Sequence, residues 1–348
     1  MQIGTMLHHK YFNGVVPANR SSVYKYRVTG FTQSFGMRGT GIFAMVAPKG
    51  PSPDSYEWRN VDKIVEFCER NNLRLHYNTV LFGHLDGYPE WFKELTPEAK
   101  LRALERHVRL VVGRYKYKVE FFKLMNESLG GDSIDFLGTG KSRVELISNV
   151  FQWAKETYPE GKYMWNEHSP SFREDTRNEF LQIVREVQAR GVSPDIIGLQ
   201  AHMGYRPRPF KLPPDQDIKD ALTGIHEKTE VPLQITEFDL SWNNNRQGED
   251  KAEMKIDPNK PIVVDEVKYK TWFEYQAYAY QHFAEICMGL DFVKGFYYWA
   301  FNENEPWERP DCGLFDDDFK PRPEMQEWLF ELQEGKVPRE DMLEVQRV

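Results

Sequence analysis

The sequence predicts a parallel α/β barrel of eight strands, and three observations support this prediction. Apolar runs of strand length alternate with amphipathic stretches of helix length along the 348 residues, which is the pattern of parallel strands joined by crossover helices. No linker rich in Gly, Ser and Pro divides the chain, and it contains no repeat of about 20 to 50 residues. Two apolar runs end in a glutamate, and the strand ends of such a barrel form its active face. We therefore expect one catalytic barrel domain over residues 1–348.

The expected strands are short apolar runs bounded by polar or turn residues. They cover residues 3–7, 41–46, 73–82, 119–125, 162–166, 196–202, 233–238 and 296–301. The expected helices follow turn or capping residues and carry apolar side chains at helical spacing. They cover residues 58–71, 97–115, 142–157, 173–190, 215–228, 267–288 and 323–333. Residues 10–38 show no clear period, so a first helix is expected there without defined ends.

Three proline clusters follow the second, sixth and seventh expected strands, at residues 46–53, 206–214 and 256–261. In a parallel barrel these positions are the long loops on the active face. We expect them to form the walls of a substrate cleft rather than linkers between domains.

Composition narrows the possible partners. The net charge of −8 argues against a nucleic-acid partner, because nonspecific binding to phosphates needs concentrated Lys and Arg. No run approaches the roughly 18 apolar residues of a membrane helix. The three cysteines, Cys68, Cys287 and Cys312, are expected to be buried thiols, and neither a metal-ligand cluster nor a phosphate-binding glycine loop is present, so no metal or cofactor is expected.

The N-terminus lacks the pattern of a secretory signal, so we expect a cytoplasmic chain or a secreted one whose leader has been removed. The oligomeric state stays open.

Two strand-end glutamates are the candidate catalytic pair. Glu127 follows Asn126 after the run 119–125, and Glu237 lies near the end of the run 233–238. Cleavage of a glycosidic bond with retention needs one carboxylic acid that protonates the leaving oxygen and a second carboxylate, about 5 to 5.5 Å away, that attacks the anomeric carbon. Asn126 could then hydrogen-bond the sugar 2-hydroxyl. The alternative is that each glutamate is a solvated strand-end residue.

Four segments in order carry a family resemblance: GRYKYKVEFFKLMNE, RGVSPDIIGLQAHM, LQITEFDL, and FYYWAFNENEPW followed by GLFDDDFKPRP. They resemble the consecutive motifs of glycoside hydrolase family 10, the retaining endo-β-1,4-xylanases with a (β/α)8 barrel. The resemblance implies that Glu127 is the acid/base and Glu237 the nucleophile. It also implies that His202 is hydrogen-bonded to Glu237 and oriented by Asp239.

The resemblance further implies a set of substrate-binding side chains. Trp299 and Trp307, eight positions apart, would cover the lower and upper faces of the glycone sugar at the cleaved bond with their indole rings. Asn166 would be a ligand-side or supporting polar group. Its neighbour Glu167 makes a second Asn-Glu pair and is the rival candidate for the acid, but the match of the preceding GRYKYKV segment favours Glu127. The full substrate-binding set is Lys49, Asn78, His84, Asn166, Gln200, Trp299 and Trp307.

The departures from the family lie near the strand ends whose side chains would bind the sugar on the glycone side of the cleaved bond. Of the polar residues that the family has after its second strand, this chain keeps only the lysine, Lys49. Asn78 stands where the family has His. His84 replaces a second His only with a slip of one residue, and Phe122-Lys123 replaces Trp-Asp.

The expected function is an endo-β-1,4-xylanase acting on xylan or xylo-oligosaccharides. The alternatives are a retaining barrel hydrolase that acts on a decorated xylan or another β-linked glycan, and a glycan-binding barrel without catalysis.

Overall fold

The computed structural model describes residues 1–8, 11–12, 16, 18–22, 25, 39–43, 56, 58–129, 132–168, 170–204, 211–241, 257–302, 312–316 and 318–333. Two predicted site residues, Lys49 and Trp307, lie outside these ranges, as do most of the first two proline clusters.

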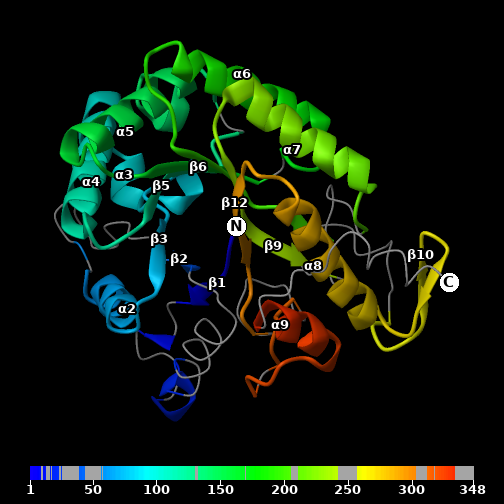
Figure 1. Ribbon diagram of the computed structural model, residues 1–348. Helices are drawn as coiled ribbons and strands as arrows, with labels where there is room; N and C mark the ends of the chain where they lie inside the picture. Colours follow the sequence, from blue (N-terminus) through cyan, green and yellow to red (C-terminus); the bar gives the residue numbers. More distant parts are fainter. Residues whose placement is uncertain are drawn as a thin grey trace.

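A closed ring of parallel strands forms the centre of the molecule (Figure 1). Its members, in the order in which they pair, are β12 (Val293–Tyr298), β1 (Gln2–His8), β2 (Gly39–Phe43), β3 (Arg74–Asn78), β5 (Phe121–Asn126), β6 (Tyr163–Glu167), β7 (Ile196–Leu199) and β9 (Leu233–Leu240). The ring closes because β12 pairs with both β1 and β9. The predicted eight-stranded α/β barrel is confirmed.

Helices cover the outside of this ring (Figure 1). The long ones are α2 (Arg59–Arg70), α4 (Pro97–Tyr115), α5 (Arg143–Thr157), α6 (Glu174–Gln188), α7 (Asp215–Thr229) and α8 (Trp272–Met288). The short ones are η2 (Leu85–Gly87), α3 (Glu90–Lys93), η3 (Phe136–Gly138), η4 (Pro323–Met325) and α9 (Gln326–Gln333). Each long helix turns a stripe of apolar side chains inward; α2, for example, buries Val61, Ile64, Val65 and Cys68.

Capping side chains explain several helix starts. Ser142 begins α5 with a capping box, in which its hydroxyl accepts from the Glu145 N–H and the Glu145 carboxylate accepts from the Ser142 N–H. Thr96 and Thr271 cap α4 and α8 in the same way through their side-chain oxygens.

Two expected strands are interrupted where polar side chains enter the barrel mouth. The run 73–82 divides into β3 and β4 (Leu81–Phe82), since Val80 N and Thr79 Oγ1 both bond to the carbonyl of Lys123 at 2.8 and 3.0 Å. The run 196–202 divides into β7 and β8 (His202–Met203) around Ala201, whose φ is 59°. Both short strands remain in the barrel wall because β4 pairs with β5 and β8 with β9.

The expected helix 267–288 begins later than predicted, at Trp272. Residues Val267–Tyr269 form β11, which pairs antiparallel with β10 (Ile262–Val264). The helix can begin only after Thr271, whose side chain accepts from the Glu274 N–H and so fixes its start.

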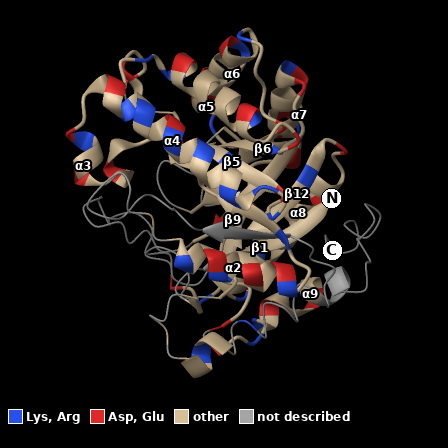
Figure 2. Cartoon of the chain, turned by 90° about the vertical axis from the view of Figure 1, so that its left-hand side faces the viewer, with Lys and Arg blue, Asp and Glu red and all other residues tan. Residues whose placement is uncertain are grey.

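All three cysteines are buried thiols, as predicted. Within the described residues, no helix is long and apolar enough to cross a membrane. In the view of Figure 2, Lys/Arg and Asp/Glu residues are interspersed along the outer helices.

Candidate active site

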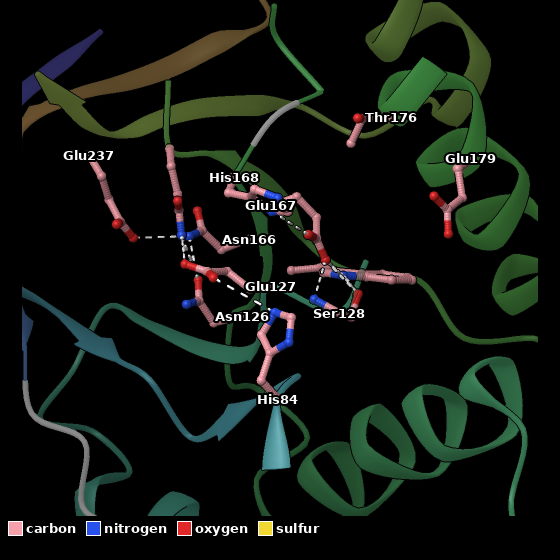
Figure 3. A network of polar contacts seen from close by, with 12 residues as sticks. His84, Asn126, Glu127, Ser128, Asn166, Glu167, His168, Thr176, Glu179 and Glu237 are labelled. Carbon is pink, nitrogen blue, oxygen red and sulfur yellow. Dashed lines mark hydrogen bonds and ion pairs between the residues drawn. The ribbon is translucent and has the colours of Figure 1, made fainter. Parts of the chain in front are cut away.

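The candidate site lies at the C-terminal ends of the barrel strands. Asn126 ends β5, Asn166 and Glu167 end β6, and Glu237 and Asp239 lie on β9. Because the strands are parallel, their carboxyl ends meet at one mouth of the barrel, where Asn126, Asn166 and Glu237 point toward one another (Figure 3).

Glu237 is buried, and both of its carboxylate oxygens are occupied. Its Oε1 lies 2.5 Å from Lys123 Nζ and accepts a hydrogen bond from Asn166 Nδ2 at 3.0 Å. Its Oε2 lies 3.2 Å from His202 Nε2. Burial opposes ionisation, but the charge of Lys123 and the hydrogen bond with His202 outweigh it and lower the pKa of Glu237 to about 2. Glu237 is therefore held as a carboxylate.

His202 joins the two acidic side chains of β9. Its Nδ1 lies 2.9 Å from Asp239 Oδ1, on the side of the ring opposite Glu237. The Trp299 ring meets the His202 ring edge to face, with centroids 5.3 Å apart, and fixes its plane. The predicted contacts of His202 with Glu237 and Asp239 are present.

Glu127 occupies a different environment. Its side chain is 27% exposed, against 4% for Glu237. Its Oε1 accepts from Gln200 Nε2 at 2.8 Å, and His84 Nε2 lies 4.0 Å from its Oε2. An accessible carboxyl exchanges a proton with a substrate and water more readily than the enclosed carboxylate of Glu237 does. The two glutamates differ in the sense that acid and nucleophile require.

The backbone at Glu127 is tightly constrained. Its φ is +54°, in the left-handed region that non-glycine residues seldom adopt. The Glu127 N–H donates to the Asn166 carbonyl at 3.0 Å, and the Gly83 N–H donates to the Asn126 carbonyl at 2.8 Å. A Cβ at Gly83 would lie 1.9 Å from the Glu127 carbonyl oxygen, so the two segments can approach this closely only because residue 83 is glycine.

Asn166 connects the polar groups of three strands. Its Nδ2 donates to Asn126 Oδ1 at 2.6 Å as well as to Glu237, and its Oδ1 accepts from Thr236 Oγ1 at 2.6 Å. Gln200 Nε2 lies 3.4 Å from the same Asn126 oxygen. The predicted supporting role of Asn166 therefore matches its place in this network.

Glu167, the rival candidate for the acid, is fully buried. Its Oε1 accepts from the Ser128 N–H at 2.7 Å and from Trp165 Nε1 at 3.1 Å (Figure 3). It holds the backbone just after Glu127 and has no surface from which to reach a substrate. The geometry thus favours Glu127 over Glu167.

Asn78 is also enclosed, with 2% of its surface exposed. Among the residues that the structure describes, no hydrogen-bond partner reaches its Oδ1. The predicted sugar contact of Asn78 stays a prediction, as do those of Lys49 and Trp307.

Lys123 is the site residue whose contact the sequence analysis did not anticipate. It was noted only as half of a Phe-Lys pair that replaces Trp-Asp. A signal was available, because Lys is depleted in strands and almost never fully buried without a partner. A lysine between Phe122 and Leu124 in an apolar strand should have been assigned a carboxylate partner.

Comparison with known proteins identifies the family. The family model described as glycosyl hydrolase family 10 matches residues 3–329, nearly the whole chain. The chain belongs to glycosyl hydrolase family 10. The family expected from the sequence motifs is thereby confirmed.

Relatives in sequence are distant. Over 230 residues the chain is 27% identical to a beta-1,4-xylanase of Dictyoglomus thermophilum, covering 64% of this chain and 62% of that protein. Over 268 residues it is 23% identical to endo-1,4-beta-xylanase C of Paenibacillus barcinonensis, covering 71% of this chain and 23% of that protein. The chain therefore spans less than two thirds of the length of either relative.

Solved structures share the family 10 fold over almost the whole chain. Native xylanase 10B from Thermotoga maritima superposes with a TM-score of 0.75 at 22% identity, covering 96% of this chain and 95% of that one. Xylanase 10B from Thermotoga petrophila in complex with xylobiose gives the same TM-score and identity, covering 97% and 94%.

Proposed function

We propose that this family 10 chain is a retaining β-glycanase, an endo-β-1,4-xylanase that hydrolyses xylan or xylo-oligosaccharides. The observation that carries the proposal is the pairing of a buried, ionised Glu237 on β9 with a more exposed Glu127 after β5, both at the same mouth of the barrel. The relatives named as β-1,4-xylanases support the substrate class.

In the first step Glu237 attacks the anomeric carbon while Glu127 transfers its proton to the leaving oxygen. A bond forms between Glu237 and the sugar, the glycosidic bond breaks, and the departing chain leaves with a new hydroxyl. In the second step water attacks the same carbon and gives a proton to Glu127. The Glu237 ester bond breaks, and its electron pair returns to the carboxylate. Two inversions give net retention.

The surrounding residues orient these two groups. Asn126, fixed by Asn166, is placed to hydrogen-bond the sugar 2-hydroxyl, a contact that strengthens in the transition state. His202, held by Asp239, keeps Glu237 in one orientation. Trp299 is expected to stack against the sugar at the cleaved bond. This chemistry needs only the two carboxylates, so we propose that a single barrel performs it without metal or cofactor.

The departures from the family near β3 and β5 favour a second candidate for the preferred glycan. Where the family has His and Trp-Asp, this chain has Asn78 and Phe122-Lys123. A site built on hydrogen bonds to sugar hydroxyls discriminates strongly against substrates that do not satisfy them. A decorated xylan or another β-linked glycan is accordingly the second candidate substrate.

Hydrolysis assays test the proposal. The wild type and Glu237→Ala are incubated with xylan, xylo-oligosaccharides and a panel of other β-glycans, and reducing ends are counted. We expect the wild type to release oligosaccharides and Glu237→Ala to fall to the background rate. Equal activity in the two proteins would contradict the assignment. Glycan binding in calorimetry, without product over long incubation, would indicate a binding barrel instead.

A further inference from the structure

A lysine and a glutamate form an ion pair inside the barrel mouth. The Lys123 and Glu237 side chains are each 4% exposed, and Lys123 Nζ lies 2.5 Å from Glu237 Oε1. Removing two charges from water is unfavourable, and mutual attraction repays this only when the geometry is good. Here the carboxylate also takes a hydrogen bond from Asn166.

The pair forms across the barrel. Lys123 lies in the middle of β5, three residues before the Asn126 that ends the strand, and Glu237 lies on β9. The charge of Glu127 also acts on the ammonium, and both carboxylates favour its charged form, whereas burial lowers the pKa of Lys123. The cation thus lies beside the carboxylate that changes charge in both steps of the proposed reaction.

We propose that Lys123 is a positioning residue that favours the return of Glu237 to a free carboxylate and so speeds breakdown of the glycosyl–enzyme intermediate. This inference rests on the proposed function and assigns a role within that same site.

The reasoning follows the charge on Glu237. When Glu237 forms its ester with the anomeric carbon, it becomes neutral, and Lys123 loses the charge of the carboxylate at 2.5 Å, one of the two that compensate its burial. When water displaces the ester, negative charge returns to Glu237 beside the ammonium, and the transition state for this step is stabilised. Lys123 therefore opposes the first step and assists the second, so that the intermediate does not accumulate.

The test uses an aryl β-xylobioside with a good leaving group, so that the first step is fast and the released phenol can be followed by absorbance. The variants are Lys123→Met, which removes the charge at similar length, and Lys123→Arg, which keeps it. The matched control is Lys162→Met, because Lys162 is 59% exposed and its Nζ lies 3.7 Å from Asp195 Oδ1, outside the contacts of the site.

For Lys123→Met we expect a burst of about one phenol per enzyme and a covalent sugar adduct in the intact-protein mass spectrum. The steady-state kcat should fall about 10- to 100-fold, the factor that a hydrogen bond to a charged group supplies. KM should fall at least as much, so that kcat/KM, which reports the first step, is retained or raised. Lys123→Arg and Lys162→Met should show neither burst nor adduct.

Three results would overturn the inference. The first is a Lys123→Met protein that turns over without burst or adduct, and the second is a loss confined to kcat/KM, as a purely structural role would give. Circular dichroism checks folding, and Lys123→Gln is assayed in the same way if the methionine variant does not fold. The third is a wild type that releases no phenol. Of the three results, only this one would also contradict the proposed function.

Discussion

At the residue scale, the site depends on how Glu237 is kept charged. Burial alone would favour its neutral form, yet the charge of Lys123 and the hydrogen bond with His202 lower the pKa of Glu237 to about 2, from an ordinary value of 4.5. Glu127, which follows β5, is partly exposed; its Oε1 accepts from neutral Gln200, and His84 lies 4.0 Å from its Oε2. Both groups are glutamate carboxyls, so their different roles result from the residues around each of them.

The acidic limb of the pH profile of kcat/KM should depend on the lowered pKa of Glu237. A nucleophile with a lowered pKa stays ionised as the pH falls from 4.5 towards 2, so Glu237 should not limit kcat/KM of the wild type in that range. The groups that face or act on it are Lys123, His202, Asp239 and, through Lys123, Glu127. Lys123→Met removes a cation, which raises the pKa of Glu237 and moves the acidic limb to higher pH. Identical limbs in Lys123→Met and Lys123→Arg would contradict this.

Replacement of Glu127 should distinguish it from its neighbour Glu167. We expect Glu127→Ala to lose about 10²- to 10⁴-fold in the hydrolysis of xylan, because general acid catalysis contributes that much. The loss should be far smaller on an aryl glycoside whose leaving group needs no proton, and added azide should restore turnover there. Glu167→Gln should affect both substrates alike, since Glu167 holds the Ser128 backbone. A dependence on the leaving group in Glu167→Gln alone would reverse the assignment.

At the scale of elements, the close approach of Gly83 to the end of β5 fixes the backbone of Glu127. A Cβ at residue 83 would lie 1.9 Å from the Glu127 carbonyl oxygen, closer than any real contact. Gly83→Ala should therefore displace Glu127 and lower kcat by about 100-fold, as small misplacements of catalytic groups do. The assay is xylan hydrolysis.

The matched control is Gly224→Ala, within α7. An added Cβ there meets nothing within 4 Å, and Ala is favoured over Gly in a helix by about 1 kcal/mol. This variant should keep its activity and unfold at equal or higher urea concentration. Full activity in Gly83→Ala would show that the segment moves freely and that the close approach is unimportant.

Most elements could be predicted from the sequence because the apolar period and the capping residues are local signals. The starts of α4 and α5 follow directly from Thr96 and Ser142. The divided runs 73–82 and 196–202 could not be predicted, since the interruption of the first comes from bonds to the Lys123 carbonyl on another strand. The hairpin of β10 and β11 was missed because its strands are only three residues long.

The candidate site was predictable in its residue types and less so in its contacts. Glu127, Glu237, His202 and Asp239 were located from strand ends and family motifs. The ion pair of Lys123 depends on two strands, β5 and β9, meeting across the barrel, and no local pattern encodes that distance. Likewise, Glu167 repeats the Asn-Glu pattern of residues 126–127; the GRYKYKV segment before Glu127 favours Glu127 as the acid, and the burial of Glu167 supports the same choice.

At the scale of the whole molecule, the barrel closes where the last strand meets the first. β12 pairs with β1 on one side and with β9 on the other, and Trp328 of α9 contacts Tyr298 at the end of β12. The indole Nε1 of Trp328 donates to Tyr298 Oη at 2.8 Å, and the side chain is 2% exposed. The C-terminal helix thereby stabilises the strand that completes the ring.

Truncation of this anchor should destabilise the protein. Trp328→Ala is expected to lower the free energy of unfolding by about 3 to 5 kcal/mol, the range for a buried tryptophan. Urea denaturation followed by circular dichroism measures it. Ile134→Ala serves as the control, because Ile134 is 81% exposed and should change stability by no more than about 0.5 kcal/mol. A similar small effect in both variants would show that α9 does not support the barrel.

The most direct test of the central claim is to identify the residue that becomes attached to the sugar. The wild type is incubated with a 2-deoxy-2-fluoro aryl xylobioside, which slows breakdown of the intermediate, and is then digested and sequenced by mass spectrometry. A retaining glycanase with Glu237 as nucleophile predicts one sugar adduct, located on Glu237. An adduct on Glu127 or Glu167, or hydrolysis of natural substrates with inversion at the anomeric carbon, would contradict it.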